Sequence, residues 1–219
     1  MCNLYRMTTN ADAMRQLFGP LDTGGANVPP MDEVYPEALA PVIVSGGPGE
    51  TRKLATMRWG WPPFGEIKRP ITNVRNLASP MWRSALTDPA RRCLVPATAF
   101  SEWSAKPDPA TGRKRKHWFA LADGSPFAFA GLWRPTGDGP RFAFLTAPPN
   151  AMVGAIHPKA MPVLLTPGLL ADAWLSVGGP AAVAMQQPFA DDAMRELPGE
   201  PDGSPKNATP APKEPDLFS

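Results

Sequence analysis

Short apolar runs, rich in aromatic residues, fill the middle of the chain and constrain its fold more than any other feature. They lie within 92–103 (RCLVPATAFSEW), 116–135 (KHWFALADGSPFAFAGLWRP) and 141–148 (RFAFLTAP), and the turn sequence ADGSP divides the second segment. Runs of this length bounded by Gly, Pro and Asp are typical of β-strands. We therefore expect one strand in the first segment, followed by a β-meander through the second and third.

Shorter elements are predicted on the N-terminal side of this region. Residues 10–19 have apolar side chains at helical spacing after Thr8 or Thr9 as N-cap, and a glycine ends the pattern, which predicts an early helix. Residues 29–41 are rich in proline and predict an irregular connection. Residues 40–60 contain two apolar runs around the turn GGPGE, which indicates a β-hairpin.

Further helices and strands are predicted around and after the β-rich middle. Ser79, followed by proline, is a good N-cap and predicts a short helix within 79–92. Beyond residue 160 the apolar patterns predict a strand at 161–165 (MPVLL), a helix at 166–178 and a last strand at 181–189 (AAVAMQQPF).

Length and composition favour a single domain. A chain of 219 residues with 43% hydrophobic content suffices for one core, which we expect to span 1–197. From 198 to 219 Pro, Gly and charged residues dominate, which predicts a disordered tail. No apolar run approaches the ~20 residues of a membrane helix, and no secretory signal begins the chain. The net charge of +2 leaves the partner open, and the two cysteines are expected to stay reduced in the cytoplasm.

The second residue carries the most distinctive chemistry. Removal of Met1, which is usual when the next side chain is small, leaves Cys2 with a free α-amine beside its thiol. Reference pKa values of ~7.7–8.0 for the amine and ~8.5 for the thiol give both groups reactive fractions near neutral pH. The amine can condense with an aldehyde, and the thiolate can then close a five-membered thiazolidine. Taken alone, a cysteine at a chain end is more often a tolerated small residue.

Sequence blocks spread over most of the chain resemble one protein family. In order, the blocks are MCNLYRM, MRWGWPP, ITNVRNLA, RRCLVPATAFSEW, FAGLWRP and FLTAPPNAMVGAIHPKAMPVLL. From Cys2 to Leu165 they resemble the SOS response-associated peptidase (SRAP) family of abasic-site shielding proteins. The resemblance implies an α+β fold, with a single SRAP-like domain, a β-rich, barrel-like core and a few flanking short helices. It also implies a covalent cross-link between Cys2 and abasic sites in single-stranded DNA.

The resemblance places Asn73, Glu102 and His157 beside Cys2. Glu102 would move protons while the sugar ring opens and while the amine condenses. His157 would hydrogen-bond or protonate the sugar oxygen near neutral pH, and Asn73 would orient the adduct with its donor and acceptor. The structural alternatives are a solvated Glu, a satisfied His and a turn-forming Asn. We expect no cofactor and no metal.

A second set of side chains is expected to hold the DNA strand. Its cations would contact phosphates, its tryptophans would stack on bases or fill the core, and a small hydroxyl would line the pocket. The set comprises Arg58, Trp59, Trp61, Arg75, Trp103, Thr146 and Lys159. Many family members have a shorter HxRMP segment where this chain has IHPKAMP, which displaces the basic side chain of Lys159.

Other functions stay open at this point. A thiol, a histidine and a carboxylate also suit a thiol peptidase, which would remove its own N-terminus, and the tryptophans and arginines alone suit a non-covalent module for single-stranded DNA. Strand incision as a lyase is not decided by the sequence.

The tail ends in Asp216, Leu217 and Phe218, which resemble half of the peptides that bind the bacterial sliding clamp. We expect the protein to act in the cytoplasm, at the nucleoid.

Overall fold

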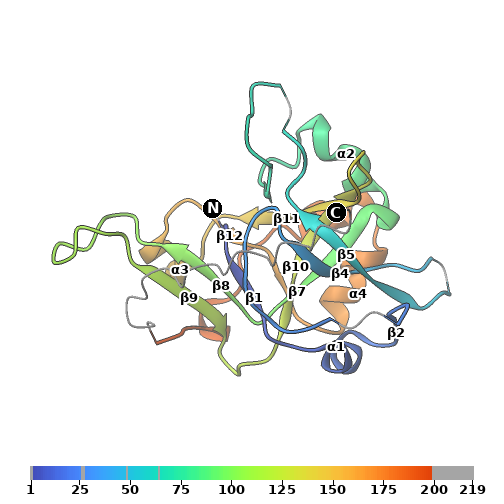
Figure 1. The fold of residues 1–219 in the computed structure, drawn as a ribbon, viewed down its shortest axis with the longest axis horizontal. Coiled ribbons are helices and arrows are strands. Elements are labelled where there is room, and N and C mark those ends of the chain that lie inside the picture. Colours follow the sequence, from blue (N-terminus) through green and yellow to red (C-terminus); the bar gives the residue numbers. More distant parts are fainter. Residues whose placement is uncertain (1, 26–27, 48, 64, 199–219) are drawn as a thin grey trace, which may run out of the picture.

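A closed ring of five β-strands forms the centre of the computed structural model, which describes residues 2–25, 28–47, 49–63 and 65–198 (Figure 1). The ring strands are β4 (Leu39–Val44), β5 (Arg52–Trp59), β7 (Arg92–Ala97), β10 (Phe127–Arg134) and β11 (Arg141–Ala147). All neighbours are antiparallel except β5 and β11, which pair in parallel through Arg58 and Arg141. An odd number of strands cannot alternate all the way round a closed ring, so one parallel pair must close it. The expected α+β fold with a barrel-like core is confirmed.

Aromatic side chains fill the interior of the barrel. Phe129 of β10 stacks on Phe144 of β11 at 4.5 Å between ring centroids, and Trp59 stacks on Phe144 at 5.1 Å. Tyr5 meets Trp59 edge-on at 5.2 Å. Large rings at offset or edge-on geometry combine apolar burial with favourable quadrupole contacts. The aromatic residues of the short apolar runs that predicted strands therefore also pack the core.

A second sheet lies beside the barrel and contains the N-terminal strand. Its order is β14 (Met194–Glu196), β9 (Lys116–Leu121), β8 (Ala99–Trp103), β1 (Tyr5–Met7) and β3 (Met31–Val34). The expectation of one strand over 92–103 is wrong, because the chain passes from β7 in the barrel to β8 in this sheet at Thr98. The Thr98 backbone N–H donates to the carbonyl of Arg6 at 2.8 Å, which fixes the break. The meander is correspondingly incomplete, since β9 pairs with β8 and β14 while β10 and β11 pair with each other.

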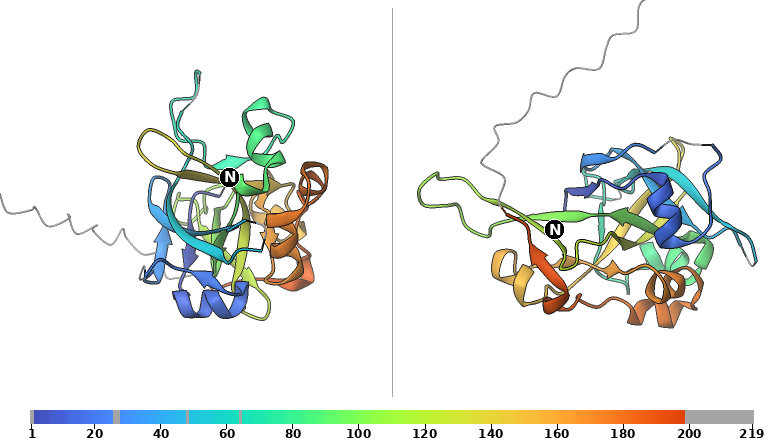
Figure 2. Two further views of the ribbon diagram at one scale, coloured as in Figure 1. Left: turned by 90° about the vertical axis from the view of Figure 1, so that its right-hand side faces the viewer. Right: turned by 90° about the horizontal axis from the view of Figure 1, so that it is seen from below.

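Short strands and helices complete the fold around the barrel. The strands are β2 (Leu21–Asp22), β6 (Asn73–Val74), β12 (Met161–Pro162) and β13 (Leu164–Leu165). The helices are α1 (Ala11–Phe18), α2 (Pro80–Thr87), α3 (Ala151–Ile156), α4 (Leu169–Ser176) and α5 (Gly179–Ala184), with 3₁₀ turns at Pro89–Arg91 and Asp191–Ala193. Figure 2 shows α4 and α5 (orange) together on one side of the barrel and α1 (blue) at another edge.

Local sequence signals predicted most of these elements. The helices within 10–19, 79–92 and 166–178 and the hairpin within 40–60 are confirmed by α1, α2, α4 and the β4–β5 pair. The cap of α1 is Asn10, whose side chain accepts from the N–H of Ala13, in place of Thr8 or Thr9. The strand expected at 161–165 is divided into β12 and β13.

Two segments of the chain contradict the sequence-based expectations. Residues 29–41 are not wholly irregular, because they contain β3 and the start of β4. Residues 181–189 do not form a strand: Pro180 lies in the first turn of α5, where a missing N–H costs nothing, and alanine is the best helix former.

The C-terminal tail lies outside the described residues. The expected disorder of 198–219 and the sliding-clamp peptide therefore concern a segment of which the structure describes only Pro198. Among the helices of the described ranges, none combines the length and the apolar character needed to cross a membrane.

Candidate functional site

Cys2 lies just before β1 and is held by that strand's partners. The backbone N–H of Ser101 in β8 donates to the carbonyl of Leu4 at 3.0 Å, and the Cys2 thiol lies 3.5 Å from the same carbonyl oxygen. The Cys2 side chain has no exposed surface. Far from fraying, the start of the described chain is built into the fold.

Asn73 holds the backbone of Cys2 from the opposite side. It lies in β6, which pairs in parallel with β11 so that Asn73 is in register with Phe144. Its Nδ2 donates to the carbonyl oxygen of Cys2 at 3.0 Å and contacts Thr72 Oγ1 at 2.7 Å. Within the described part of the chain its buried Oδ1 has no hydrogen-bond partner. A buried acceptor without a donor costs about 1–3 kcal/mol, so this oxygen is available to a ligand hydroxyl.

Glu102 and His157 complete the group of side chains expected around Cys2. Glu102 lies in β8 and is 2% exposed, while His157 directly follows α3. His157 Nδ1 is 3.7 Å from Glu102 Oε2, which is within ion-pair range but too long for a hydrogen bond. The backbone N–H of Ala105 donates to the carbonyl of Ile156 at 3.0 Å and ties the chain after β8 to the end of α3.

Burial shifts the pKa of each titratable group in the site. It raises the pKa of Glu102 to about 7, so that both protonation states are populated at neutral pH. Burial, reinforced by the negative charge of Glu102, raises the pKa of the Cys2 thiol above its usual range. Burial lowers the pKa of His157, and the charges of Lys159 and Lys114 act in the same direction.

Together these groups suit proton transfer next to a nucleophile. A carboxyl group whose pKa lies near the working pH can both donate and accept a proton. The thiol is protonated at neutral pH and needs such a base before it can attack, and the imidazole is mainly neutral. The four residues expected at the reactive centre, from four distant parts of the sequence, thus lie side by side. No cluster of three or more His, Cys, Asp or Glu suited to a metal ion occurs among the described residues.

A family model described as SOS response associated peptidase (SRAP) matches residues 1–198. The chain belongs to this family. The resemblance seen in the sequence blocks is confirmed.

Solved structures share the fold of this chain, and curated proteins share part of its sequence. A protein from Bordetella bronchiseptica is 25% identical with a TM-score of 0.70, and the match covers 89% of this chain and 98% of that one. A protein from Bacteroides thetaiotaomicron is 21% identical with a TM-score of 0.71, over 89% and 90%. The abasic site processing protein YoqW of Bacillus subtilis (strain 168), and its namesake from Bacillus phage SPbeta, are 32% identical over 130 residues. That match covers 54% of this chain and 55%, about half, of the relatives' length.

The side chains expected to bind DNA in this SRAP chain are distributed unevenly. Arg75 and Lys159 are exposed, and the Trp103 side chain is 47% exposed at the end of β8. Arg58 is half-buried and donates from Nη1 to the carbonyl of Glu37 at 2.6 Å. Thr146 is fully buried, and its Oγ1 has no hydrogen-bond partner within the described ranges. Arg75, Trp103 and Lys159 thus remain available to a strand, whereas Arg58 is partly engaged in the fold.

Trp59 and Trp61 correct the expected stacking surface, because both belong to the core. Trp59 is fully buried among the barrel aromatics, and its Nε1 donates to the carbonyl of Thr72 at 3.1 Å. Trp61 is 2% exposed, with its ring centroid 4.5 Å from that of Trp82 and the Arg134 guanidinium 4.5 Å above it. Neither ring has a face open to a base in this structure.

Sequence reasoning missed two residues near the site. Gln186, after α5, donates from Nε2 to the carbonyls of both Thr146 and Arg75 at 2.7 Å and so joins two expected site segments. Lys114 acts electrostatically on His157 from the loop between β8 and β9. Neither had a usable signal in the sequence: Gln186 lies in a segment predicted to be a strand, and Lys114 is one of several consecutive basic residues.

Proposed function

We propose that this SRAP chain forms a covalent thiazolidine cross-link through Cys2 with abasic sites in single-stranded DNA, as part of the response to DNA damage. The cluster of Asn73, Glu102 and His157 around Cys2 carries this proposal. The name of the curated relatives, abasic site processing protein, supports it. The partner is the damaged strand, and the place of action is the nucleoid.

The reaction begins once the Met1–Cys2 peptide bond is cut, which gives Cys2 a free α-amine. That amine attacks the aldehyde carbon of the ring-opened sugar to give a carbinolamine. Loss of the aldehyde oxygen as water yields a Schiff base. The thiol sulfur then bonds to the imine carbon while the imine nitrogen gains a proton, so aldehyde plus aminothiol becomes thiazolidine plus one water.

Each neighbouring side chain has a role in this sequence. Glu102, with a pKa of about 7, protonates the departing hydroxyl and later accepts the thiol proton. His157 hydrogen-bonds the sugar oxygen as the ring opens. Asn73 keeps the Cys2 carbonyl fixed through Nδ2 and presents Oδ1 to a sugar hydroxyl, and Thr146 offers its buried Oγ1 nearby. Exposed Arg75 and Lys159 contact flanking phosphates, and Trp103 stacks on a base.

Intact-mass analysis with and without an abasic oligonucleotide tests the proposal. The mature protein should lack Met1 and gain the mass of the oligonucleotide less one water, whereas an undamaged oligonucleotide should add nothing. Cys2→Ser should lose the adduct and keep single-strand affinity. Glu102→Gln should slow adduct formation by ~10²-fold or more, the usual scale of general acid–base catalysis. An adduct that forms equally well with Cys2→Ala would refute the covalent mechanism.

A second candidate function is autocatalytic removal of the N-terminus. It is favoured by the electrostatic effect of Glu102 on the buried thiol of Cys2, because a base close to the thiol could assist attack on the preceding peptide bond. Intact-mass analysis also distinguishes self-cleavage from removal of Met1 by an aminopeptidase. If the protein cuts itself, Met1 should be retained in the Cys2→Ala and Glu102→Gln variants expressed under identical conditions. If a cellular aminopeptidase removes Met1, this residue should be absent from both variants.

A further inference from the structure

The loop between β8 and β9, residues 104–115, is strongly basic and projects from the molecule as the long loop at the left of Figure 1. We call it the basic finger. Its four cations are Lys106, Arg113, Lys114 and Arg115, against the single acid Asp108. All four cations are exposed, and within the described ranges their ion pairing is limited to a loose contact of 4.0 Å between Arg115 and Asp108. The finger therefore presents positive charge that the fold hardly neutralises.

Hydrogen bonds give the basic finger a defined shape. At its base the backbone N–H of Ser104 donates to the carbonyl of Arg115 at 2.9 Å, and the N–H of Arg115 donates to Ser104 Oγ at 3.0 Å. Near its tip the N–H of Asp108 donates to the carbonyl of Arg113 at 2.7 Å. Gly112 turns the chain with φ of +67°, a conformation that favours glycine. Because the loop is bonded across, the backbone that carries its cations follows a defined path.

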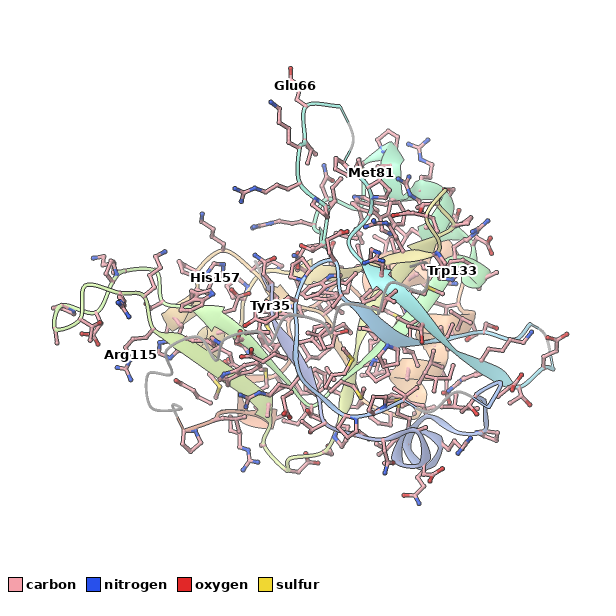
Figure 3. All side chains as sticks on the ribbon, in the orientation of Figure 1. Tyr35, Glu66, Met81, Arg115, Trp133 and His157 are labelled. Carbon is pink, nitrogen blue, oxygen red and sulfur yellow. The ribbon has the colours of Figure 1, made fainter. Side chains whose placement is uncertain are left out.

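The base of the basic finger is joined to the reactive site. Ala105 is bonded to the carbonyl of Ile156, the residue before His157, and Figure 3 shows His157 beside the base of the loop that bears Arg115. Trp103, immediately before the finger, is half-exposed and has the ammonium of Lys116 5.7 Å from its ring centroid. Cations next to an open aromatic face are the elements that bind single strands without sequence preference.

From this placement we infer that the basic finger binds the phosphates of the lesion-bearing single strand where it leaves the site past His157, with Trp103 stacking on a base. This inference extends the proposed function by assigning the path of the strand on one side of the lesion. An acidic protein surface would match the charge, but the finger leads directly to the reactive site, where the proposed partner is a DNA strand. A flexible single strand can contact both the cations of the basic finger and the indole ring of Trp103.

The salt dependence of strand binding tests the finger separately from the covalent chemistry. Binding of an undamaged single-stranded oligonucleotide is measured in a Cys2→Ser background, where no cross-link forms. Each phosphate contact to a single strand contributes about 0.7 to the slope of log K against log salt. Arg113→Gln combined with Lys114→Gln should therefore make the slope less steep by about 1.4. The control combines Lys53→Gln and Arg195→Gln and should leave the slope unchanged. Lys53 is exposed near the start of β5, and Arg195 is exposed in β14 opposite Ala120, at the end of β9 away from the finger.

Three results would overturn the inference: an unaltered slope in the finger variant, an equal change in the control, or a larger loss of affinity for duplex DNA than for the single strand. The last would assign the finger to a duplex. Adduct formation is measured in parallel with Cys2 intact. If finger and control variants both form the adduct at saturating DNA but share one slope, only the finger inference fails. If no chain forms the adduct while the finger variant changes the slope, only the covalent mechanism fails.

Discussion

Replacing Glu102 with Gln should change how the stability of the protein depends on pH. The folded state holds this carboxyl with a pKa of about 7, against an ordinary value of 4.5, because the side chain is buried. Between these two values the folded protein binds the proton more tightly than the unfolded chain does. The contribution of the protonated Glu102 side chain to the stability of the fold is therefore complete below pH 4.5 and is lost as the pH rises through 7.

The size of this effect follows from the shift itself. One pKa unit corresponds to 1.36 kcal/mol. As the pH rises from below 4.5 to above 7, ionisation of Glu102 should therefore lower the free energy of unfolding by about 3 kcal/mol. With a urea m-value of about 2–3 kcal/mol per molar, the unfolding midpoint should shift by about 1 M. Gln keeps the shape of the side chain and cannot titrate. The difference in stability between the parent and Glu102→Gln should therefore grow in favour of the variant as the pH rises.

Urea unfolding at several pH values from 4.5 to 8, on both proteins, measures this difference. His157 titrates in the same region with the opposite sign: its pKa is lowered, so its contribution is present above the ordinary value of 6.5 and is lost as the pH falls. His157→Gln in both backgrounds removes that contribution. A parent-minus-variant difference that stays constant across the range would mean that Glu102 is ionised in the folded state, and the acid–base role assigned to it would fall.

Other substitutions probe the site, its surface and the barrel. Asn73→Asp replaces the donor to the Cys2 carbonyl by an acceptor, so it should lower the melting temperature and slow adduct formation; full activity would show that this bond does not position the terminus. Trp103→Ala should weaken single-strand binding by ~1–3 kcal/mol without lowering the melting temperature, whereas Trp61→Ala, at a buried position, should cost ~3–5 kcal/mol of stability. Calorimetry and a binding titration measure both effects; a large loss of stability in Trp103→Ala, or none in Trp61→Ala, would contradict the assignment. Gly131→Ala should destabilise by ~1–3 kcal/mol in denaturant unfolding, because its Cβ would lie 2.6 Å from the sulfur of Cys93; an unchanged midpoint would mean that the barrel yields there.

Elements whose signals are local were predictable from the sequence. The helix α2 has a proline in its first turn and buries Trp82, Ala85 and Leu86 at helical spacing, all within a few residues of one another. The division at Thr98 was not predictable, because its cause is a bond to Arg6, far away in the sequence. Closure of the barrel depends in the same way on a pairing between Arg58 and Arg141.

The site shows the same contrast between chemistry and placement. The resemblance indicated Cys2, Asn73, Glu102 and His157, whose residue types suit the proposed chemistry wherever the chain brings them together. Which face of a strand a tryptophan occupies is decided by the barrel, and this is why the sequence left open whether Trp59 stacks on bases or fills the core, where the structure places it. Lys114 likewise has no distinguishing feature in the sequence, because its electrostatic effect on His157 depends on the fold that brings the basic finger there.

The parallel pairing along β11 also has a consequence for the order in which the protein matures on the ribosome. In the sequence, Cys2 precedes Asn73, which holds its carbonyl and is anchored by β11, and it also precedes His157, which follows β11. Contacts between such distant parts of a chain are slow to form, because they must overcome the entropy of closing a long loop. As the chain is synthesised, Cys2 is therefore made well before the side chains that the proposed mechanism assigns to proton transfer and to orientation of the adduct. In the proposed mechanism, trimming of Met1 can therefore precede assembly of the site, and acid–base assistance at Cys2 becomes available only after β11 and His157 have been synthesised.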